Sequence, residues 1–468
     1  MPGRARNRVR ALPSRAANAT QRNLDRDDRR HLVHGFISPA TARDEGTLTL
    51  SRGRGAYVWD SEGRRYLDGL ASLWNVHVGH GRTEIARAAA AQMAKLAFAP
   101  TLLGFSSEPA IRLAKRLAGW APAGMSHVFF TSGGSEANES MIRLTRLYWR
   151  LRGRQDKYKI VALERAYHGS STGSASLTGL TQFHKYYEPL LPGVVRMPDA
   201  YCYRCPLLLR YPECALACAD ELERVLEREG SETVAAFIAE PVQGVGGVIV
   251  PPPGYFERIR EICDRHDVLF VVDEVITGFG RLGTPFGISR WAAVPDMIVF
   301  AKGVTSGYLP LGGVILSDSI YGTLEDAGRD FALSHGFTYS GHPAACAAAM
   351  ANLDILEREK LLARTRRLTP HFARRLSALA ALDIVGDVRT AGLMAAVELV
   401  ADKEKRTPFA ADLAVPSRVR SACLRRGVIV RGSGDNVVVC PPLIIEPREI
   451  DLIAATLDEA LREVAAQL

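Results

Sequence analysis

The chain has 468 residues, of which 47% are hydrophobic and 24% charged, and its net charge at pH 7 is +8. This length favours two domains or one large α/β enzyme, and the composition is that of a globular protein. No run of about 18 apolar residues occurs, so we expect no membrane-spanning segment and no membrane partner.

The first 30 residues carry most of the net charge. They contain nine Arg and three Asp, which accounts for six of the eight positive charges. A nucleic-acid-binding protein would spread Arg and Lys over a folded face, so we expect no nucleic-acid partner. We predict a disordered, Arg-rich leader over residues 1–30. An arm that folds over a partner subunit and an organelle transit peptide are the alternatives.

Residues 47–70 alternate in the manner of a β-meander. Tyr57-Val58-Trp59 is followed there by the turn Asp60-Ser61-Glu62-Gly63. We assign residues 31–74 to a smaller domain that is completed by the C-terminal part of the chain.

From about residue 125 to 315, short apolar runs alternate with amphipathic helical stretches. This pattern is typical of a mostly parallel sheet covered by helices, whose strands are buried on both faces. We expect this sheet in a large domain over residues 75–340. The predicted strands are His127–Thr131, Lys159–Leu163, Val234–Ala239, Val268–Val272, Met297–Ala301 and Gly312–Leu316.

The eight Cys include one cluster, Cys202-x2-Cys205-x8-Cys214-x3-Cys218. Its spacing could suit a tetrahedral zinc site, but the cluster contains no His. We expect reduced thiols that pack a surface loop, with a structural metal or disulfides as alternatives, and no metal in the active site. The other Cys are scattered, which is typical of a reducing cytoplasm, where we place the protein.

A helix rich in small residues, Pro343–Arg358, opens the C-terminal region. Shorter strands are predicted at Met394–Leu399 and Val437–Cys440, and a closing helix begins near Pro447. We expect a smaller α+β domain over residues 341–468.

Polar side chains follow the predicted strands of the large sheet. In an open parallel sheet, ligands bind beyond the carboxyl ends of the strands, so these residues should meet at one edge. They are Thr131-Ser132-Gly133-Gly134-Ser135, Tyr167-His168, Glu240, Asp273 and Lys302.

Three of these elements suggest one cofactor. The turn Gly133-Gly134-Ser135 precedes a helical run, so free N–H groups and the helix dipole could hold a phosphate. A buried carboxylate such as Asp273 needs a partner, for which a protonated pyridine nitrogen is suited; a helix N-cap is the alternative. Lys302 follows an apolar strand and, if desolvated, could attack an aldehyde as a neutral amine; a surface lysine is the alternative. Together they predict an enzyme that uses pyridoxal 5′-phosphate (PLP).

Over roughly residues 30–465, the chain resembles the class III aminotransferases of the fold-type-I PLP enzymes. The most specific stretches are VVDEVITGFGRLG (271–283), AKGVTSGYLPLGG (301–313), AEPVQGVGGVIVPP (239–252) and HGFTYSGHP (335–343). The resemblance implies an α/β fold with a mostly parallel seven-stranded sheet and a smaller α+β domain. It also implies a homodimer, or a tetramer built from two dimers.

The resemblance implies catalytic roles for Lys302, which forms the Schiff base with PLP, and Asp273, which pairs with the pyridine nitrogen. Tyr167 and Val275 would pack against opposite faces of the cofactor ring. Glu240 would lie near the ring's 3-hydroxyl.

The resemblance also implies a phosphate site made by two subunits. Gly134 and Ser135, together with Gly133, would hold the phosphate from one subunit. Thr338 would reach the phosphate of the neighbouring subunit's cofactor.

Within the family, the chain looks most similar to the ω-amino acid and amine:pyruvate aminotransferases. The similarity rests on Leu73-Trp74-Asn75-Val76, Tyr167-His168-Gly169 and Val430-Arg431-Gly432-Ser433-Gly434-Asp435. Trp74 and Tyr167 would wall an apolar pocket for the amine. Arg431 would clamp the carboxylate of pyruvate or alanine; a surface arginine beside the glycines is the alternative.

We therefore expect transfer of an amino group from an ω-amino acid, amine or diamine to pyruvate, which gives an aldehyde or ketone and alanine. The segment His168-Gly169-Ser170-Ser171-Thr172 lacks the Arg that glutamate-using members commonly carry there, and this favours pyruvate. The alternatives are an aminotransferase that uses 2-oxoglutarate and a PLP aminomutase or racemase on the same fold. The identity of the donor stays open.

Overall fold

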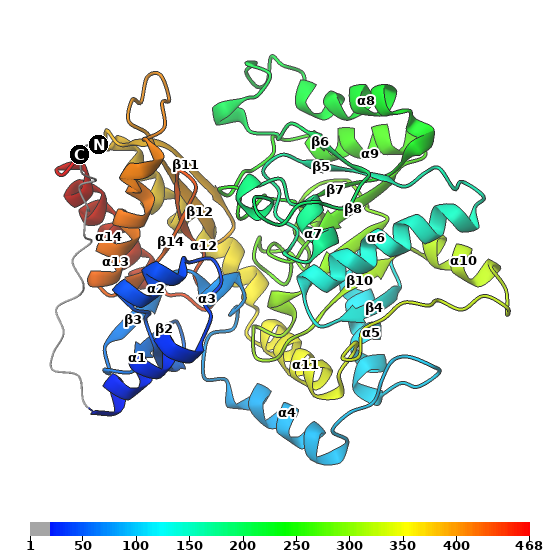
Figure 1. The fold of residues 1–468 in the computed structure, drawn as a ribbon, viewed down its shortest axis with the longest axis horizontal. Helices are drawn as coiled ribbons and strands as arrows, with labels where there is room; N and C mark the ends of the chain where they lie inside the picture. The colour runs from blue at the N-terminus through cyan, green and yellow to red at the C-terminus, as the bar shows by residue number, and fades with distance from the viewer. Residues whose placement is uncertain (1–18) are drawn as a thin grey trace.

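The computed structural model describes residues 19–468, and within them the strands form three sheets. Figure 1 shows two lobes, of which one holds the largest sheet and its helices. The other lobe brings the N-terminal elements (blue) together with the C-terminal ones (orange and red).

The largest sheet is mixed and has seven strands, as the resemblance implies. The strands are β4 (His127–Thr131), β5 (Lys159–Leu163), β6 (Val194–Met197), β7 (Val234–Ala239), β8 (Leu269–Asp273), β9 (Met297–Phe300) and β10 (Gly312–Leu316). Their order is β4-β10-β9-β8-β7-β5-β6, and only β10 runs antiparallel to its neighbours. Six strands were predicted to within one residue. The edge strand β6 was not, because it is short and Arg196 interrupts its apolar run.

Alternate residues of the central strands pack on opposite faces of this sheet. Phe237 and Phe270 belong to one fully buried cluster, whereas Ile238 and Val271 belong to a second one. Since side chains alternate along a strand, both faces need a cover of helices. The helices of this lobe are α4 (Thr83–Lys95), α5 (Glu108–Trp120), α6 (Gly134–Leu151), α7 (Thr172–Leu177), α8 (Ala217–Glu229), α9 (Tyr255–Arg265), α10 (Asp318–Asp326) and α11 (Pro343–Arg358). The sequence placed α11 in the smaller domain, but the helix packs against α4 and α5 of this lobe.

Two four-stranded sheets build the other lobe. One has the order β1-β2-β3-β13 and the other β11-β12-β15-β14. Their strands are β1 (Leu50–Arg54), β2 (Tyr57–Asp60), β3 (Arg65–Asp68), β11 (Val385–Ala391), β12 (Met394–Leu399), β13 (Val428–Ile429), β14 (Arg431–Ser433) and β15 (Asn436–Val439). Val428 of β13 pairs in parallel with Leu67 of β3, so the N-terminal meander and the C-terminal region share one sheet.

The helices of the second lobe come from both ends of the chain. They are α1 (Ala19–His31), α2 (Pro39–Glu45), α3 (Ala71–Trp74), α12 (Leu361–Ser377), α13 (Val415–Arg425) and α14 (Pro447–Ala465). Strand β11 was not predicted, because Asp387, Arg389 and Thr390 break its apolar pattern.

The predicted leader over residues 1–30 needs a correction. Residues 19–30 belong to helix α1, so the expected disorder does not hold for them. Asp28 accepts hydrogen bonds from Thr47 Oγ1 (2.9 Å) and His34 Nε2 (3.0 Å), and Arg29 donates to the carbonyl of Arg43 (2.6 Å). These bonds hold the helix against the segment that follows it. Residues 1–18 lie outside the described residues.

The four clustered Cys are free thiols that line one small cavity with Tyr201 and Tyr211. Burial raises the pKa of Cys218 to about 12, which favours its thiol form. Among residues 19–468, no group of three or more His, Cys, Asp or Glu side chains is placed to hold a metal ion.

In the part of the chain that the structure describes, no helix is long and apolar enough to cross a membrane.

Candidate active site

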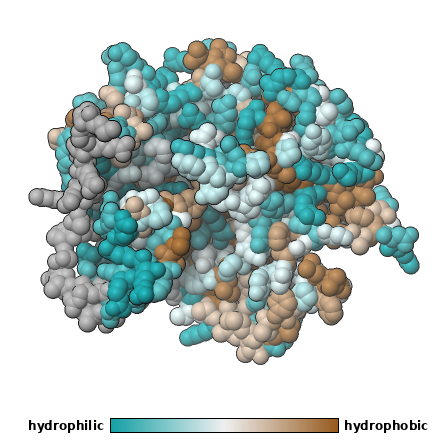
Figure 2. Space-filling view, in the orientation of Figure 1, coloured by the Kyte–Doolittle hydropathy of each residue, from teal (hydrophilic) through white to brown (hydrophobic). Residues whose placement is uncertain are grey.

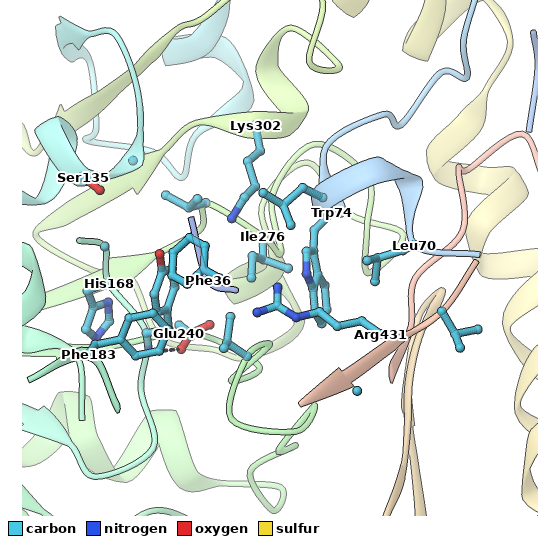
Figure 3. A pocket seen from close by; sticks show the side chains of 18 of the residues that line it. Phe36, Leu70, Trp74, Ser135, His168, Phe183, Glu240, Ile276, Lys302 and Arg431 are labelled. Atoms are coloured by element: carbon cyan, nitrogen blue, oxygen red, sulfur yellow. Dashed lines mark hydrogen bonds between the residues drawn. The ribbon is translucent and has the colours of Figure 1, made fainter. Parts of the chain in front are cut away.

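A cavity of about 600 Å³ lies where the strands of the large sheet end. Nine of the residues predicted from the sequence line it: Trp74, Gly134, Ser135, Tyr167, Glu240, Asp273, Val275, Lys302 and Arg431. In Figure 3, the amine of Lys302 and the guanidinium of Arg431 point into this cavity from different sides. The sheet topology therefore brings together residues that are far apart in sequence.

The carboxylate of Asp273 is buried at the end of β8. Its Oδ2 accepts hydrogen bonds from His168 Nδ1 (2.8 Å) and Asn138 Nδ2 (2.9 Å), and its Oδ1 accepts from the N–H of Val275 (3.0 Å). A carboxylate offers about four acceptor positions, so one remains for a donor in the cavity. The N–H of a protonated pyridine ring fits this position.

Lys302 begins the turn after β9, and its backbone is left-handed, with φ of 46°. This conformation is uncommon for residues with a side chain and is often found at functional sites. The next residue, Gly303, packs so tightly that a Cβ there would lie 2.4 Å from Cε1 of His77. The turn that aims Lys302 at the cavity therefore requires glycine at this point.

The amine of Lys302 is less basic than that of an ordinary lysine. Burial lowers its pKa, while the carboxylates of Asp273 and Glu240 oppose this shift and the cation of Arg431 adds to it. A lower pKa leaves more of the amine neutral, which is the form that attacks a carbonyl carbon.

Glu240 lies directly after β7 and is buried. It accepts hydrogen bonds from the N–H groups of Tyr167 (3.0 Å) and Gly244 (2.9 Å). Burial, together with the nearby charge of Asp273, raises the pKa of Glu240 to about 8. At neutral pH its side chain is therefore mostly protonated.

The N-terminus of α6 forms an open cup. No side chain caps this terminus, so the N–H groups of the first turn are available to a ligand. Gly134 and Ser135 line the cavity, while the N-cap Gly133 lies just outside its lining. A Cβ at Gly134 would come within 3.2 Å of Val275, so glycine leaves the cup open. An uncapped helix start with this shape fits a phosphate group.

An aromatic series leads from the sheet edge toward the N-terminal segment. The ring centroid of Tyr167 lies 5.0 Å from that of Phe183, which lies 5.7 Å from that of Phe36. All three line the cavity. Phe36 is 79% exposed, so it marks the mouth of the cavity.

Trp74 ends a strained turn. Its φ is 65°, and its side chain is buried in the cavity wall. The carboxylate of Asp68 accepts hydrogen bonds from the N–H groups of Leu70 (3.2 Å) and Ser72 (2.9 Å). These bonds hold the turn in a conformation that residues with side chains seldom adopt.

Arg431 on β14 is half-buried and faces the cavity beside Trp74 (Figure 3). Its guanidinium makes no hydrogen bond or ion pair with any residue in 19–468, whereas Arg389 in the same sheet bonds to Asp387, Glu398 and Asn436. Burial lowers the pKa of Arg431, as expected for a desolvated cation that no carboxylate neutralises. This free guanidinium could bind a carboxylate.

Thr338 is exposed and does not line the cavity of its own chain. Its segment is held against the loop after α4, since Thr101 Oγ1 donates to the carbonyl of Ser340 (3.0 Å). The predicted role of Thr338 in the neighbouring subunit's site remains a prediction.

Several residues of the site were missed in the sequence, some that line the cavity and one, Asn138, that holds Asp273 from behind it. Asn138 could have been found, because it lies four residues after Gly134 and so on the same face of α6. His168 was noted only as a neighbour of Tyr167. Phe36 and Arg420 also line the cavity, but nothing in the sequence near them pointed to a ligand.

Comparison with known proteins identifies the family. A family model described as Aminotransferase class-III matches residues 40–461. The putrescine–pyruvate aminotransferase of Pseudomonas aeruginosa is 40% identical over 97% of this chain and 99% of its own length. The chain therefore belongs to the class III aminotransferases, which have the fold of the fold-type-I PLP enzymes.

Solved structures agree with this assignment. An (S)-enantioselective ω-transaminase from Thermomicrobium roseum has a TM-score of 0.93 and 45% identity, covering 96% of this chain and 100% of its own. An ω-transaminase from Pseudomonas jessenii in complex with PMP has a TM-score of 0.92 and 35% identity, covering 95% and 98% of the two chains. The cofactor of this family is PLP.

Proposed function

We propose that this aminotransferase moves an amino group from an ω-amino acid, amine or diamine to pyruvate, which gives an aldehyde or ketone and alanine. The observation that carries this proposal is the free guanidinium of Arg431, which faces the same cavity as the amine of Lys302. A small keto acid could thus be held by its carboxylate with its carbonyl carbon near the reacting centre. The name of the P. aeruginosa relative supports pyruvate as the acceptor.

The residues of the cavity suggest how PLP is held. We assign the covalent link to Nζ of Lys302 and the contact with the pyridine nitrogen to the remaining acceptor position of Asp273. The cup at Gly133, Gly134 and Ser135 would bind the phosphate.

The ring would lie between Tyr167 and Val275, with Glu240 near its 3-hydroxyl. All three side chains line the cavity. Because Glu240 is mostly protonated at neutral pH, it could donate a hydrogen bond to a ring oxygen rather than repel it.

When bound, PLP supplies an electron sink for the bond that is broken at the carbon carrying the donor's amino group. The chain's residues would do the rest. Nζ of Lys302, freed when the donor amine takes its place, would remove the proton from that carbon. Asp273, fixed by His168 and Asn138, would keep the ring nitrogen protonated. Trp74 and Tyr167 would pack against the donor's side chain and exclude water.

We further propose a homodimer, or a tetramer of two dimers, in the cytoplasm. The loop after α4 exposes Phe98, Leu103 and Phe105, which are 41%, 92% and 65% exposed. Figure 2 shows hydrophobic side chains gathered in this region of the surface. The ring of Phe98 also contacts Tyr339, the neighbour of Thr338 (6.2 Å between centroids). Exposed apolar surface beside Thr338 supports a subunit interface there.

A panel of donors measured against pyruvate and 2-oxoglutarate tests the proposed function. We expect turnover with pyruvate and at least one primary amine, and slower turnover with 2-oxoglutarate. Faster turnover with 2-oxoglutarate would replace the proposed acceptor. Isomerisation of an amino acid without any acceptor would indicate a mutase or racemase instead.

A further inference from the structure

The mouth of the cavity carries a second arginine that the proposed function does not use. Arg420 lies on α13 and lines the cavity together with Leu424, four residues further along the same face of the helix. Helix α13 approaches β14 closely at this point, since a Cβ on Gly432 would lie 3.1 Å from the backbone of Pro416. Pro416 is in turn four residues before Arg420, so this helix face is directed toward the strand that carries Arg431.

Exposure places Arg420 at the outer end of the cavity. Arg420, Phe36 and Leu73 are exposed, whereas Asp273 and Glu240 at the sheet edge are buried. Much of the rest of the cavity wall is aliphatic. Apart from Val275, the aliphatic lining residues are Leu48, Leu70, Leu73, Val245, Ile276, Leu424, Ile429 and Val430. An extended hydrocarbon chain fits such a wall.

The charges of the cavity are unequally distributed. Its only lining carboxylates within residues 19–468 are Asp273 and Glu240, and both belong to the sheet edge. Asp273 is bonded to His168 and Asn138, and Glu240 has a pKa of about 8. The outer end thus has no negative lining group.

Arg420 is not neutralised by its own chain. Across the described ranges, its guanidinium forms neither a hydrogen bond nor an ion pair, although its helix neighbours do: Arg418 donates to Gln467 and Arg425 to Glu463. An unpaired guanidinium at the mouth of a cavity attracts anions and repels a second ammonium group.

We propose that Arg420 binds a carboxylate that is separated from the reacting carbon by a chain of methylene groups. The inference rests on the proposed function and narrows its substrate class. Donors with a distant carboxylate, the ω-amino acids, are favoured over diamines, because the second ammonium of a diamine would meet the cation of Arg420 at the outer end and no lining carboxylate there. Arg431 then serves the carboxylate next to the reacting carbon, as in pyruvate, and Arg420 the one at the far end of the chain. The far carboxylate of a dicarboxylic keto acid has the same chemistry and is a second possible source of this group.

The test uses three donors of equal length with different tails: 5-aminopentanoate, pentylamine and 1,5-diaminopentane. The first half-reaction of the holoenzyme is followed with each donor through the absorbance of the bound cofactor. We expect 5-aminopentanoate to react most efficiently and the diamine least. In Arg420→Gln, the ratio of the specificity constants for 5-aminopentanoate and pentylamine should fall about tenfold, as expected for one solvent-accessible, charge-assisted contact.

Arg418→Gln is the matched control, because Arg418 is on the same helix but does not line the cavity. We expect it to leave the ratio unchanged. Arg420→Glu should reverse the preference, so that the diamine reacts faster than 5-aminopentanoate. An equal loss with all three donors in Arg420→Gln, or a wild-type preference for the diamine, would overturn the proposal.

The second half-reaction separates the two sources of a distant carboxylate. If Arg420 also serves keto acids, Arg420→Gln should slow the reaction with 2-oxoglutarate and not that with pyruvate. If Arg420 serves donors alone, the rates of the second half-reaction with pyruvate and with 2-oxoglutarate should both be unchanged in Arg420→Gln. Turnover with pyruvate separates a failure of the proposed function from a failure of the role of Arg420. No turnover of any of the three donors with pyruvate would refute the proposed function, whereas turnover with an unchanged donor ratio in Arg420→Gln would refute only the role of Arg420.

Discussion

The inner and outer ends of the cavity are built in different ways. At the inner end, Asp273 and Glu240 are buried at the ends of adjacent strands and are held by hydrogen bonds of 3.0 Å or less. At the outer end, Phe36 and Arg420 come from opposite ends of the chain and are exposed. The rigid sheet edge suits chemistry that must not vary, while the exposed segments suit the choice of substrate.

The largest effect should come from the inner end, at Lys302. Lys302→Ala should reduce turnover to background, because no other lysine lines the cavity in residues 19–468. The protein should still bind some PLP through its phosphate. Activity and the visible spectrum of the purified variant are the measurements. Lys157→Met is the control, since Lys157 is also buried but donates to the carbonyls of Ser231 and His266 away from the cavity. Wild-type turnover in Lys302→Ala would end the proposed mechanism.

Asp273→Asn should lower kcat by about a thousandfold or more, because a neutral amide cannot stabilise a protonated ring nitrogen. The measurement is kcat at saturating donor and pyruvate. Asp296→Asn is a matched control at the opposite end of the same strands, where Asp296 accepts from the N–H of Phe270 and from Arg260. It should change stability more than kcat. A loss below tenfold in Asp273→Asn would contradict the assigned role.

Arg431 lies between the inner and outer ends of the cavity, and Arg431→Ala tests whether this arginine binds the carboxylate of pyruvate. Loss of a charge-assisted, bidentate contact costs roughly 2–4 kcal/mol, so the specificity constant for pyruvate should fall about 30- to 1,000-fold. The half-reaction with an amine that lacks a carboxylate should fall much less. Single-turnover absorbance measurements separate the two half-reactions. Equal damage to both would show that the arginine is structural.

The titration of Glu240 should make the free energy of unfolding of the cofactor-free protein depend on pH, and we expect this effect to be smaller. The folded-state pKa of Glu240 is raised from an ordinary 4.5 to about 8, so the folded protein binds a proton more tightly than the unfolded chain. The resulting stabilisation is fully present below pH 4.5 and is lost as the pH rises to about 8. In urea unfolding, the stability of the wild type relative to Glu240→Gln should therefore decline over this range, by at most about 1.4 kcal/mol per pH unit. A difference that does not vary with pH would exclude this titration.

Much of the inner end could be predicted from the sequence because its signals are local. Each apolar strand is followed at once by a polar residue, as in Val271-Val272-Asp273 and Phe300-Ala301-Lys302. Parallel strands then place their carboxyl ends at one edge, which brings these residues together without further information. By contrast, a short strand interrupted by Arg196 and a polar strand containing Arg389 have no clear pattern and were missed.

The sequence by itself determined the family, six of the seven strands of the large sheet and the residues at its edge, because strand periodicity and strand-end residues depend on near neighbours in the chain. Only the tertiary structure decided which other side chains contact these edge residues and line the cavity with them. His168 bonds to Asp273 across 105 residues, and Phe36 and Arg420 reach one cavity from opposite ends of the chain. Such contacts depend on how the lobes pack, and packing between distant segments leaves no periodic signal in the sequence.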